Sequence, residues 1–263
     1  MGFLSHMTKM NSTSACIAAN FLIGIGVGLG LAKLSKRRNH LKNKKITITY
    51  FNIPALAEPL RALLVLGDYD WSDEYPSDWP AMKPTTKWGQ LPLMQIENGE
   101  QMSQTKAMFR FLAKQVVVEG AALYPDDPFE AFKVDELIEA FEDVRVKIVP
   151  SFAIKDQAEK EAFRQKLFDL PGKGEGALLM AKIEKLAGAN GHMCGDSFTA
   201  ADIWCFFWVN FLRCGFFDGL SADVCSPYPK LLAVTSKVAA LPALKAHYTT
   251  KMGIDEKYAA FAE

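Results

Sequence analysis

Acidic residues are missing from the first part of this sequence. Residues 1–57 contain eight lysines and arginines and neither aspartate nor glutamate, so Glu58 is the first acid. The remainder has 22 basic and 30 acidic residues, and the formal net charge of the whole chain is zero. A basic head and an acidic body are therefore expected to have different roles. The acidic body is not expected to bind nucleic acid, because phosphate binding requires clustered positive charge.

Cysteine and histidine are also scarce. The five cysteines form no Cys-x-x-Cys pair, and the four histidines are scattered without a metal-ligand pattern. We therefore expect no metal site and no disulfide framework, but reduced and mostly buried thiols in a cytosol-like environment. Hydrophobic residues make up 49% of the chain and charged residues 23%, a composition typical of a folded protein.

The head contains an uncharged hydrophobic segment. Residues 10–32 carry no charge, and as a helix they would reach about 34 Å, against about 30 Å for the hydrocarbon core of a bilayer. The strongly apolar part, residues 16–32, would reach only about 26 Å, which is marginal for a span. Glycines at every second position from Gly24 to Gly30 would let such a helix approach another closely. They form no dinucleotide-binding motif, because Leu29 occupies the place of its third glycine. We expect a basic head over residues 1–45 with a transmembrane helix at about 12–32.

A run of positive charge follows this segment. Seven basic residues lie between Lys33 and Lys45. Positive charge stays on the non-translocated side of a membrane, so the anchored body is expected to face the cytosol. The alternative is a cleavable targeting sequence for the mitochondrion or another organelle, because transit peptides are also basic, contain serine and are poor in acids.

The body divides into a mixed α/β part and a helical part. Strands are predicted at residues 46–51, 71–75, 91–96 and about 101–102. Helices are predicted between them at residues 54–66 and 104–114, and then, after the prolines at 125 and 128, from 129 onward and at 155–169, 174–188, 199–212, 229–240 and 242–248. The sequence therefore predicts an α/β domain over residues 46–122 and an all-helical domain over 129–263.

Four motifs, in order and spacing, resemble those of the cytosolic glutathione transferases. They are Tyr50-Phe51-Asn52 with Ala57-Glu58-Pro59-Leu60-Arg61; Trp79-Pro80-x-x-Lys83 with Gly89-Gln90-Leu91-Pro92; the stretch from Ser103 to Ala113; and Gly195 to Asp202. The chain is most similar to the sigma-like class, which includes the haematopoietic prostaglandin D synthases. The resemblance covers nearly all of residues 46–263. It implies a thioredoxin-like N-terminal domain, an all-α C-terminal domain and a two-fold dimer. In the last motif, Thr199 and Asp202 are predicted to cap a buried helix.

The resemblance implies that glutathione is the co-substrate and that Tyr50 is catalytic, with no metal. The thiol of free glutathione has a pKa of about 8.5, so it is mostly protonated at neutral pH. A tyrosine hydroxyl that donates a hydrogen bond to the sulfur would stabilise the thiolate. The alternative is an ordinary strand tyrosine with a buried ring.

The same resemblance implies the glutathione contacts. Leu91, held by a cis bond to Pro92, would offer its backbone to the cysteinyl part, and Gln90 lies in the same motif. Gln104 and Thr105 would meet the γ-glutamyl carboxylate at a helix N-terminus, where free N–H groups favour an anion.

Three further contacts are implied, each with a simpler alternative. Trp79 and Lys83 would hold the glycyl carboxylate, or they are an exposed loop aromatic and a solvated lysine. Asp135 would reach the glutathione of a neighbouring subunit, or it lies on a solvated helix face.

One departure affects the expected activity. Sigma-like members usually carry an arginine in the loop before the first helix, where this chain has Leu56. Losing that cation would raise the pKa of the thiol. The sequence therefore leaves three functions open: a membrane-tethered enzyme that conjugates glutathione to apolar electrophiles or isomerises a lipid peroxide, a non-catalytic structural subunit of a membrane complex, and a soluble organellar enzyme.

The second substrate is expected between the two domains. It would lie against the helix that contains residues 144–150 and against an aromatic run, most of which is expected to be helix core. The members of this run are Trp204, Phe206, Phe207, Trp208 and Phe211.

Overall fold

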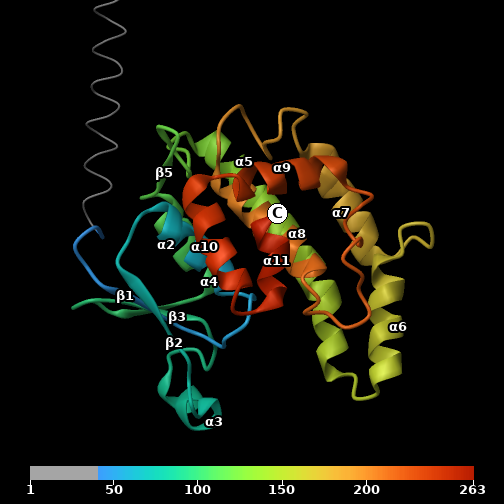
Figure 1. Cartoon of the computed structure of the whole chain (residues 1–263), viewed down its shortest axis with the longest axis horizontal. Coiled ribbons are helices and arrows are strands. Elements are labelled where there is room, and N and C mark those ends of the chain that lie inside the picture. The colour runs from blue at the N-terminus through green and yellow to red at the C-terminus, as the bar shows by residue number, and fades with distance from the viewer. Residues whose placement is uncertain (1–40) are drawn as a thin grey trace, which may run out of the picture.

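The computed structural model describes residues 41–263 (Figure 1). The transmembrane helix expected at about residues 12–32 lies outside these residues, as does most of the basic head. Within the described part of the chain, no helix is both long enough and apolar enough to cross a bilayer.

The first domain is built on a four-stranded sheet with the strand order β2-β1-β3-β4. The strands are β1 (Ile46–Thr49), β2 (Trp71–Glu74), β3 (Leu93–Ile96) and β4 (Gln101–Ser103). β1 pairs parallel with β2 and antiparallel with β3, and β3 and β4 form a hairpin. Parallel neighbours need a crossover, which α2 (Glu58–Leu66) provides, and α4 (Thr105–Ala113) packs beside α2. The predicted β-α-β unit followed by a hairpin and a helix is confirmed.

The first helix begins four residues later than predicted, at Glu58 instead of Pro54. The preceding loop is held in turns, since the N–H of Ala55 donates to the carbonyl of Ile53 and that of Glu58 to the carbonyl of Ala55. β3 also begins later, at Leu93, because the preceding proline has no N–H to donate to a ladder. In this domain the sequence did not predict the short helix α3 (Trp79–Met82) or the strand pair β5 (Val117–Val118) and β6 (Ala121–Ala122).

The second domain is entirely helical. Its elements are α5 (Pro128–Ile148), α6 (Gln157–Phe168), α7 (Glu175–Leu186), α8 (Ala200–Arg213), α9 (Pro229–Ala239), α10 (Pro242–Met252) and α11 (Ala259–Ala262). Three 3-10 turns, one of them in the first domain, lie at Lys83–Thr85, Val149–Ala153 and Glu256–Tyr258. α5 begins at Pro128, and the side chain of Asp127 accepts the N–H groups of Phe129 and Glu130. The N-terminus of α5 is thus fixed by this cap.

α8 forms the centre of the molecule. Figure 1 shows it among α5, α9 and α11, and it also packs against α2 of the first domain. Every residue from Ala200 to Leu212 is buried, as expected for a helix that is apolar on all sides. A helix buried in this way joins the two domains into one core.

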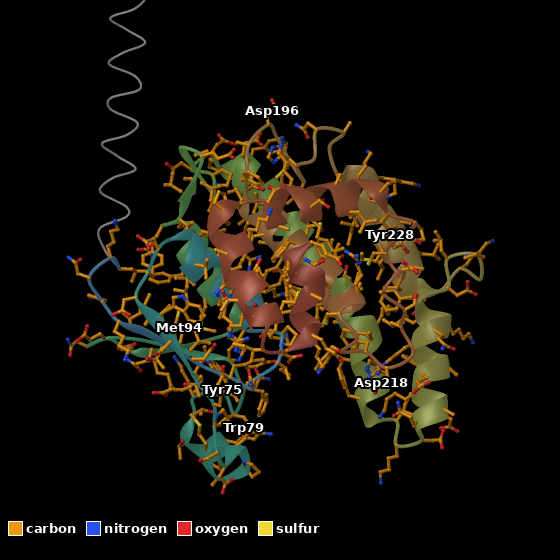
Figure 2. All side chains as sticks on the ribbon, in the orientation of Figure 1. Tyr75, Trp79, Met94, Asp196, Asp218 and Tyr228 are labelled. Carbon is orange, nitrogen blue, oxygen red and sulfur yellow. The ribbon has the colours of Figure 1, made fainter. Side chains whose placement is uncertain are left out.

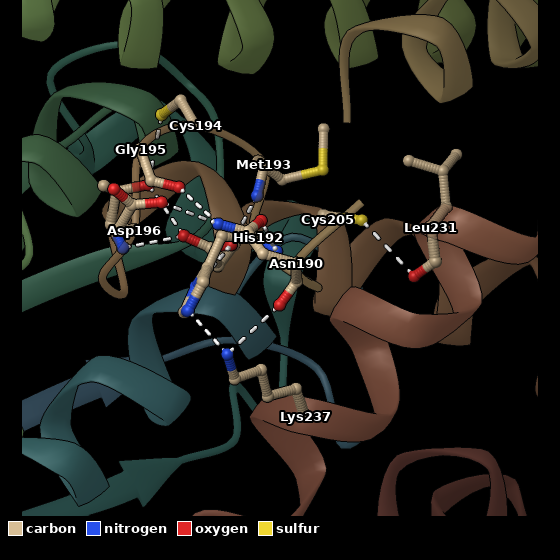
Figure 3. A network of polar contacts seen from close by, with 11 residues as sticks. Asn190, His192, Met193, Cys194, Gly195, Asp196, Cys205, Leu231 and Lys237 are labelled. Atoms are coloured by element: carbon tan, nitrogen blue, oxygen red, sulfur yellow. Dashed lines mark hydrogen bonds and ion pairs between the residues drawn. The ribbon is translucent and has the colours of Figure 1, made fainter. Parts of the chain in front are cut away.

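The N-terminus of α8 is closed by a capping box, as the sequence predicted. The Asp202 carboxylate accepts the N–H and the hydroxyl of Thr199, at 2.7 and 2.8 Å, and the N–H of Met193 at 2.7 Å. Figure 3 shows the loop before the helix, where Lys237 of α9 donates to the ring of His192 at 2.6 Å and to the carbonyl of Asn190 at 3.3 Å. At this buried helix end the N–H groups of Met193 and Thr199 therefore both have an acceptor.

Replacing Asp202 with alanine is expected to destabilise the protein strongly. The backbone N–H groups of Met193 and Thr199 would lose their acceptor inside the core, which costs about 3–5 kcal/mol of unfolding free energy. Urea denaturation measures this loss. Asp196→Ala, in the exposed part of the same loop, is the control and should cost less than about 1 kcal/mol. Equal losses of unfolding free energy in Asp202→Ala and Asp196→Ala would show that the capping box does not account for the destabilisation.

Candidate functional site

A cavity of about 460 Å³ lies between the two domains. Seven of the nine residues predicted from the sequence line it: Tyr50, Trp79, Gln90, Leu91, Pro92, Gln104 and Thr105. Its other lining residues are Phe51, Leu56, Gly89, Lys106, Glu142, Arg145 and Trp204. Segments that are far apart in the sequence therefore meet around one space.

Tyr50 lies directly after β1, at the inner wall of this cavity. Its side chain is 6% exposed. Burial raises the pKa of the hydroxyl, while a hydrogen bond from the backbone N–H of Leu56 and the charges of Arg61 and Arg145 lower it. The net pKa is raised, so the hydroxyl keeps its proton at neutral pH and can donate it to a ligand. The ring is buried like that of an ordinary strand tyrosine, yet the residue also faces the cavity.

The start of α4 provides the polar end of the cavity. Gln104 adopts a positive φ of 74° just before the helix, and no side chain caps the helix at this point. The side-chain amide of Gln104 lies 3.5 Å from the side-chain oxygen of Gln90. N–H groups at a helix N-terminus favour an anion, so this end suits a carboxylate.

The edge of the sheet contributes a second wall. The peptide bond between Leu91 and Pro92 is cis, as the sequence predicted. Both residues precede β3, where the strand ladder has not yet begun. The backbone of Leu91 is therefore placed to pair with an extended ligand in the manner of an added strand.

Trp79 and Lys83 belong to the short segment that projects from the sheet. Figure 2 shows Trp79 on α3 with Tyr75 nearby, at the end of the first domain. The ring of Trp79 contacts that of Phe51 edge to face, with centroids 6.5 Å apart. Lys83 does not line the cavity. Its aliphatic chain lies beside Gly89, which does line the cavity. Of these two residues, the structure therefore brings only Trp79 into the site.

Asp135 faces a different groove, of about 810 Å³, between α4 and α5. Its carboxylate accepts hydrogen bonds from Arg110 and, at 2.7 Å, from the hydroxyl of Tyr124. Burial and this carboxylate raise the pKa of Tyr124 to about 12. Within one chain, Asp135 is therefore an ion-pair partner, and its contact with a neighbouring subunit's glutathione stays a prediction.

A second, apolar cavity of about 130 Å³ adjoins the first and shares Tyr50, Leu56 and Arg145 with it. Its other walls are Ile53, Ala55, Ile148, Val149, Phe152, Trp208, Phe211, Phe216 and Phe217. Of the predicted aromatic run, Trp208 and Phe211 lie here, whereas Phe206 and Phe207 are buried in the core and line neither cavity. Phe216 and Phe217 follow α8 in a loop, and no motif in the sequence pointed to them.

The described residues hold no group of three or more histidine, cysteine, aspartate or glutamate side chains that could bind a metal. The four cysteines among them are free thiols, and burial raises the pKa of Cys205 and Cys225.

Comparison with known proteins gives consistent matches. A family profile described as "Glutathione S-transferase, C-terminal domain" matches residues 142–251. Glutathione S-transferase S1 of Drosophila melanogaster is 32% identical over 203 residues, which cover 76% of each chain. Hematopoietic prostaglandin D synthase of Gallus gallus is 29% identical over 76% of this chain and 92% of its own. The solved prostaglandin synthase D of Nilaparvata lugens superposes with a TM-score of 0.67 at 26% identity, over 79% of this chain and 98% of that one.

The positive φ of Gln104 leads to a testable trade-off. Such a backbone costs a non-glycine residue on the order of 1 kcal/mol or more. Gln104→Gly is therefore expected to raise the free energy of unfolding by up to about 1 kcal/mol, after allowing for the greater entropy of unfolded glycine. It should also weaken glutathione binding, measured by calorimetry, by about tenfold because the side chain at the carboxylate end is lost.

Glu119→Gly is the matched control, since Glu119 also has a positive φ and does not line the cavity. It should relieve strain with no change in glutathione affinity. If Gln104→Gly and the unmodified protein bind glutathione with equal affinity, the γ-glutamyl carboxylate does not bind beside the Gln104 side chain.

Proposed function

This chain belongs to the glutathione S-transferase family, and we propose that it activates the glutathione thiol at Tyr50 for attack on an apolar electrophile or for isomerisation of a lipid peroxide. The observation that carries this proposal is the pair of adjoining cavities that share Tyr50. One is lined by polar groups suited to a peptide with carboxylates, and the other is apolar.

Glutathione would bind in an extended conformation. Its γ-glutamyl carboxylate would lie at the N-terminus of α4, beside Gln104 and Thr105. Its cysteinyl backbone would pair with Leu91, and its glycyl end would lie toward Trp79. This placement directs the thiol to the hydroxyl of Tyr50, at the border with the apolar cavity.

Tyr50 would stabilise the thiolate by donating a hydrogen bond to the sulfur. The hydroxyl can do so because its raised pKa keeps the proton on oxygen and because the N–H of Leu56 already occupies an acceptor site of that oxygen. Each unit by which the thiol pKa falls corresponds to about 1.4 kcal/mol of stabilisation of the anion. The thiolate then supplies the electron pair of the new sulfur bond to an electrophile held in the apolar cavity.

A homodimer is part of the proposal. Phe129 and Phe132 on α5 are 65% and 56% exposed, and their rings lie 6.4 Å apart in a stacked arrangement. Phe132 also lines the groove that contains Asp135. An exposed aromatic pair beside a groove supports an interface with a second copy, and Asp135 lies on the same helix face.

A non-catalytic role in a membrane complex is the second candidate. The observation that favours it is Leu56, which lines both cavities beside Tyr50 without contributing a positive charge. In that case the cavity would bind glutathione weakly or not at all.

Replacing Tyr50 with phenylalanine tests the enzymatic proposal. The loss of the hydroxyl should raise the pKa of bound glutathione by about 2 units and lower kcat/KM for a model electrophile by about 100-fold. The Kd for glutathione should change less than about threefold, because its carboxylate contacts remain. Tyr75→Phe, at an exposed tyrosine of the same domain, is the control and should leave the rate unchanged. An inactive wild-type protein with no glutathione binding would instead favour the structural role.

Membrane attachment through the head is the remaining part of the proposal, and vesicle flotation tests it. The full chain should float with the vesicles, since residues 10–32 are uncharged and residues 16–32 are strongly apolar, whereas a chain that begins at residue 41 should stay in the soluble fraction. The N-terminal sequence of the protein isolated from its cell separates the alternatives. Loss of the head from the isolated protein would favour an organellar enzyme over an anchored one.

A further inference from the structure

Arg145 lies where the polar and apolar cavities meet. It is on α5, and it lines both cavities together with Tyr50 and Leu56. Its side chain is 33% exposed. Glu142, one turn earlier, accepts a hydrogen bond from Nε at 2.8 Å and forms an ion pair with Nη2 at 2.6 Å. Glu142 thereby holds one edge of the guanidinium and leaves Nη1 as the donor for a ligand.

Two other positively charged side chains lie near Tyr50, but each is held in an ion pair and neither lines the apolar cavity. Arg61 of α2 is buried and pairs with Glu58 at 2.8 Å and Asp73 at 2.9 Å. Lys106 of α4 lines the polar cavity, but its ammonium is paired with Glu139 of α5. The loop between β1 and α2 lines the two cavities with uncharged side chains only, and α8 presents the neutral Trp204 and Trp208.

We propose that Arg145 is the cation that stabilises the glutathione thiolate beside Tyr50, with Glu142 as its positioning residue. This inference rests on the proposed function, and it adds a catalytic residue that the helical domain supplies. A guanidinium suits the task because it stays charged at every working pH and accepts no proton from the thiol. The charge of Arg145 already acts on the Tyr50 hydroxyl, whose pKa it lowers. Thiol activation would then depend on the ion pairs that hold α5 beside α4.

The expected size of the effect follows from the surroundings of the side chain. An opposite charge within about 4–6 Å lowers a pKa by about 1–3 units. Partial exposure to water and the negative charge of Glu142 reduce the effect of Arg145, so a contribution of about one unit is expected.

The experiment uses the full chain and titrates the ultraviolet absorbance of the bound glutathione thiolate against pH. Arg145→Met should raise the pKa of the bound thiol by about one unit. It should also lower kcat/KM near neutral pH about tenfold, and the loss should disappear as the pH rises and the thiolate forms without help. Arg145→Lys keeps the charge and should recover most of the shift.

Two controls isolate the effect on the sulfur. Lys147→Met, on the same helix with its ammonium paired to Glu175, should leave the thiol pKa unchanged. S-methylglutathione has no ionisable thiol, so Arg145→Met should bind it as tightly as the unmodified protein does. Urea denaturation of each variant confirms that it is folded.

The possible outcomes separate the two proposals. If the unmodified protein binds and ionises glutathione but Arg145→Met has the same thiol pKa, the role of Arg145 is wrong and the proposed function stands. Weaker binding of S-methylglutathione with no shift of the thiol pKa would mean that Arg145 only shapes the pocket, which also overturns the inference. If the unmodified protein neither binds nor ionises glutathione, both proposals fail.

Discussion

The guanidinium of Arg61 is buried, and its need for partners fixes the loop on which the site is built. Nε donates to Asp73 of β2 at 2.9 Å, Nη1 to Glu58 at 2.8 Å and to the carbonyl of Ile53 at 3.1 Å, and Nη2 to the carbonyl of Phe51 at 3.4 Å. A buried charge that loses one of its partners costs several kcal/mol of unfolding free energy, so all of these contacts are needed to keep Arg61 buried. The loop that they hold brings the N–H of Leu56 to the hydroxyl of Tyr50.

The central helix α8 belongs to the second domain and packs against α2 and α4 of the first domain. Trp204 packs on Phe109 of α4, with ring centroids 4.7 Å apart, and it also lines the polar cavity. One turn further along the helix, Trp208 lines the apolar cavity. The two cavities therefore share one wall, and the N–H of Ala200 at the start of α8 donates to the carbonyl of Leu123 at 2.6 Å. Tyr50 and Arg145 line the same two cavities because both domains pack on the same helix.

Motifs of local origin could be found in the sequence. The cis bond before Pro92, the helix start after Gln104 and the capping box each depend on residues within a few positions of one another. The start of α2 was placed too early, because the pattern from Pro54 onward satisfies helical spacing while the contacts of Arg61 hold that segment in turns. Lys83 and Asp135 were grouped with the site by motif, whereas the direction of the Asp135 side chain depends on its hydrogen bonds with Arg110 and Tyr124.

The sequence by itself determined the division into an α/β part and a helical part, since strand and helix periodicities and prolines are local properties. It also identified the polar lining of the cavity from motifs that resemble one family. Only the tertiary structure decided which aromatics of α8 reach a cavity, that Phe216 and Phe217 close it, and that Arg145 stands beside Tyr50. The physical reason is that Tyr50 and Arg145, 95 positions apart in the chain, are brought together by burial of apolar surface between domains, which has no sequence spacing of its own.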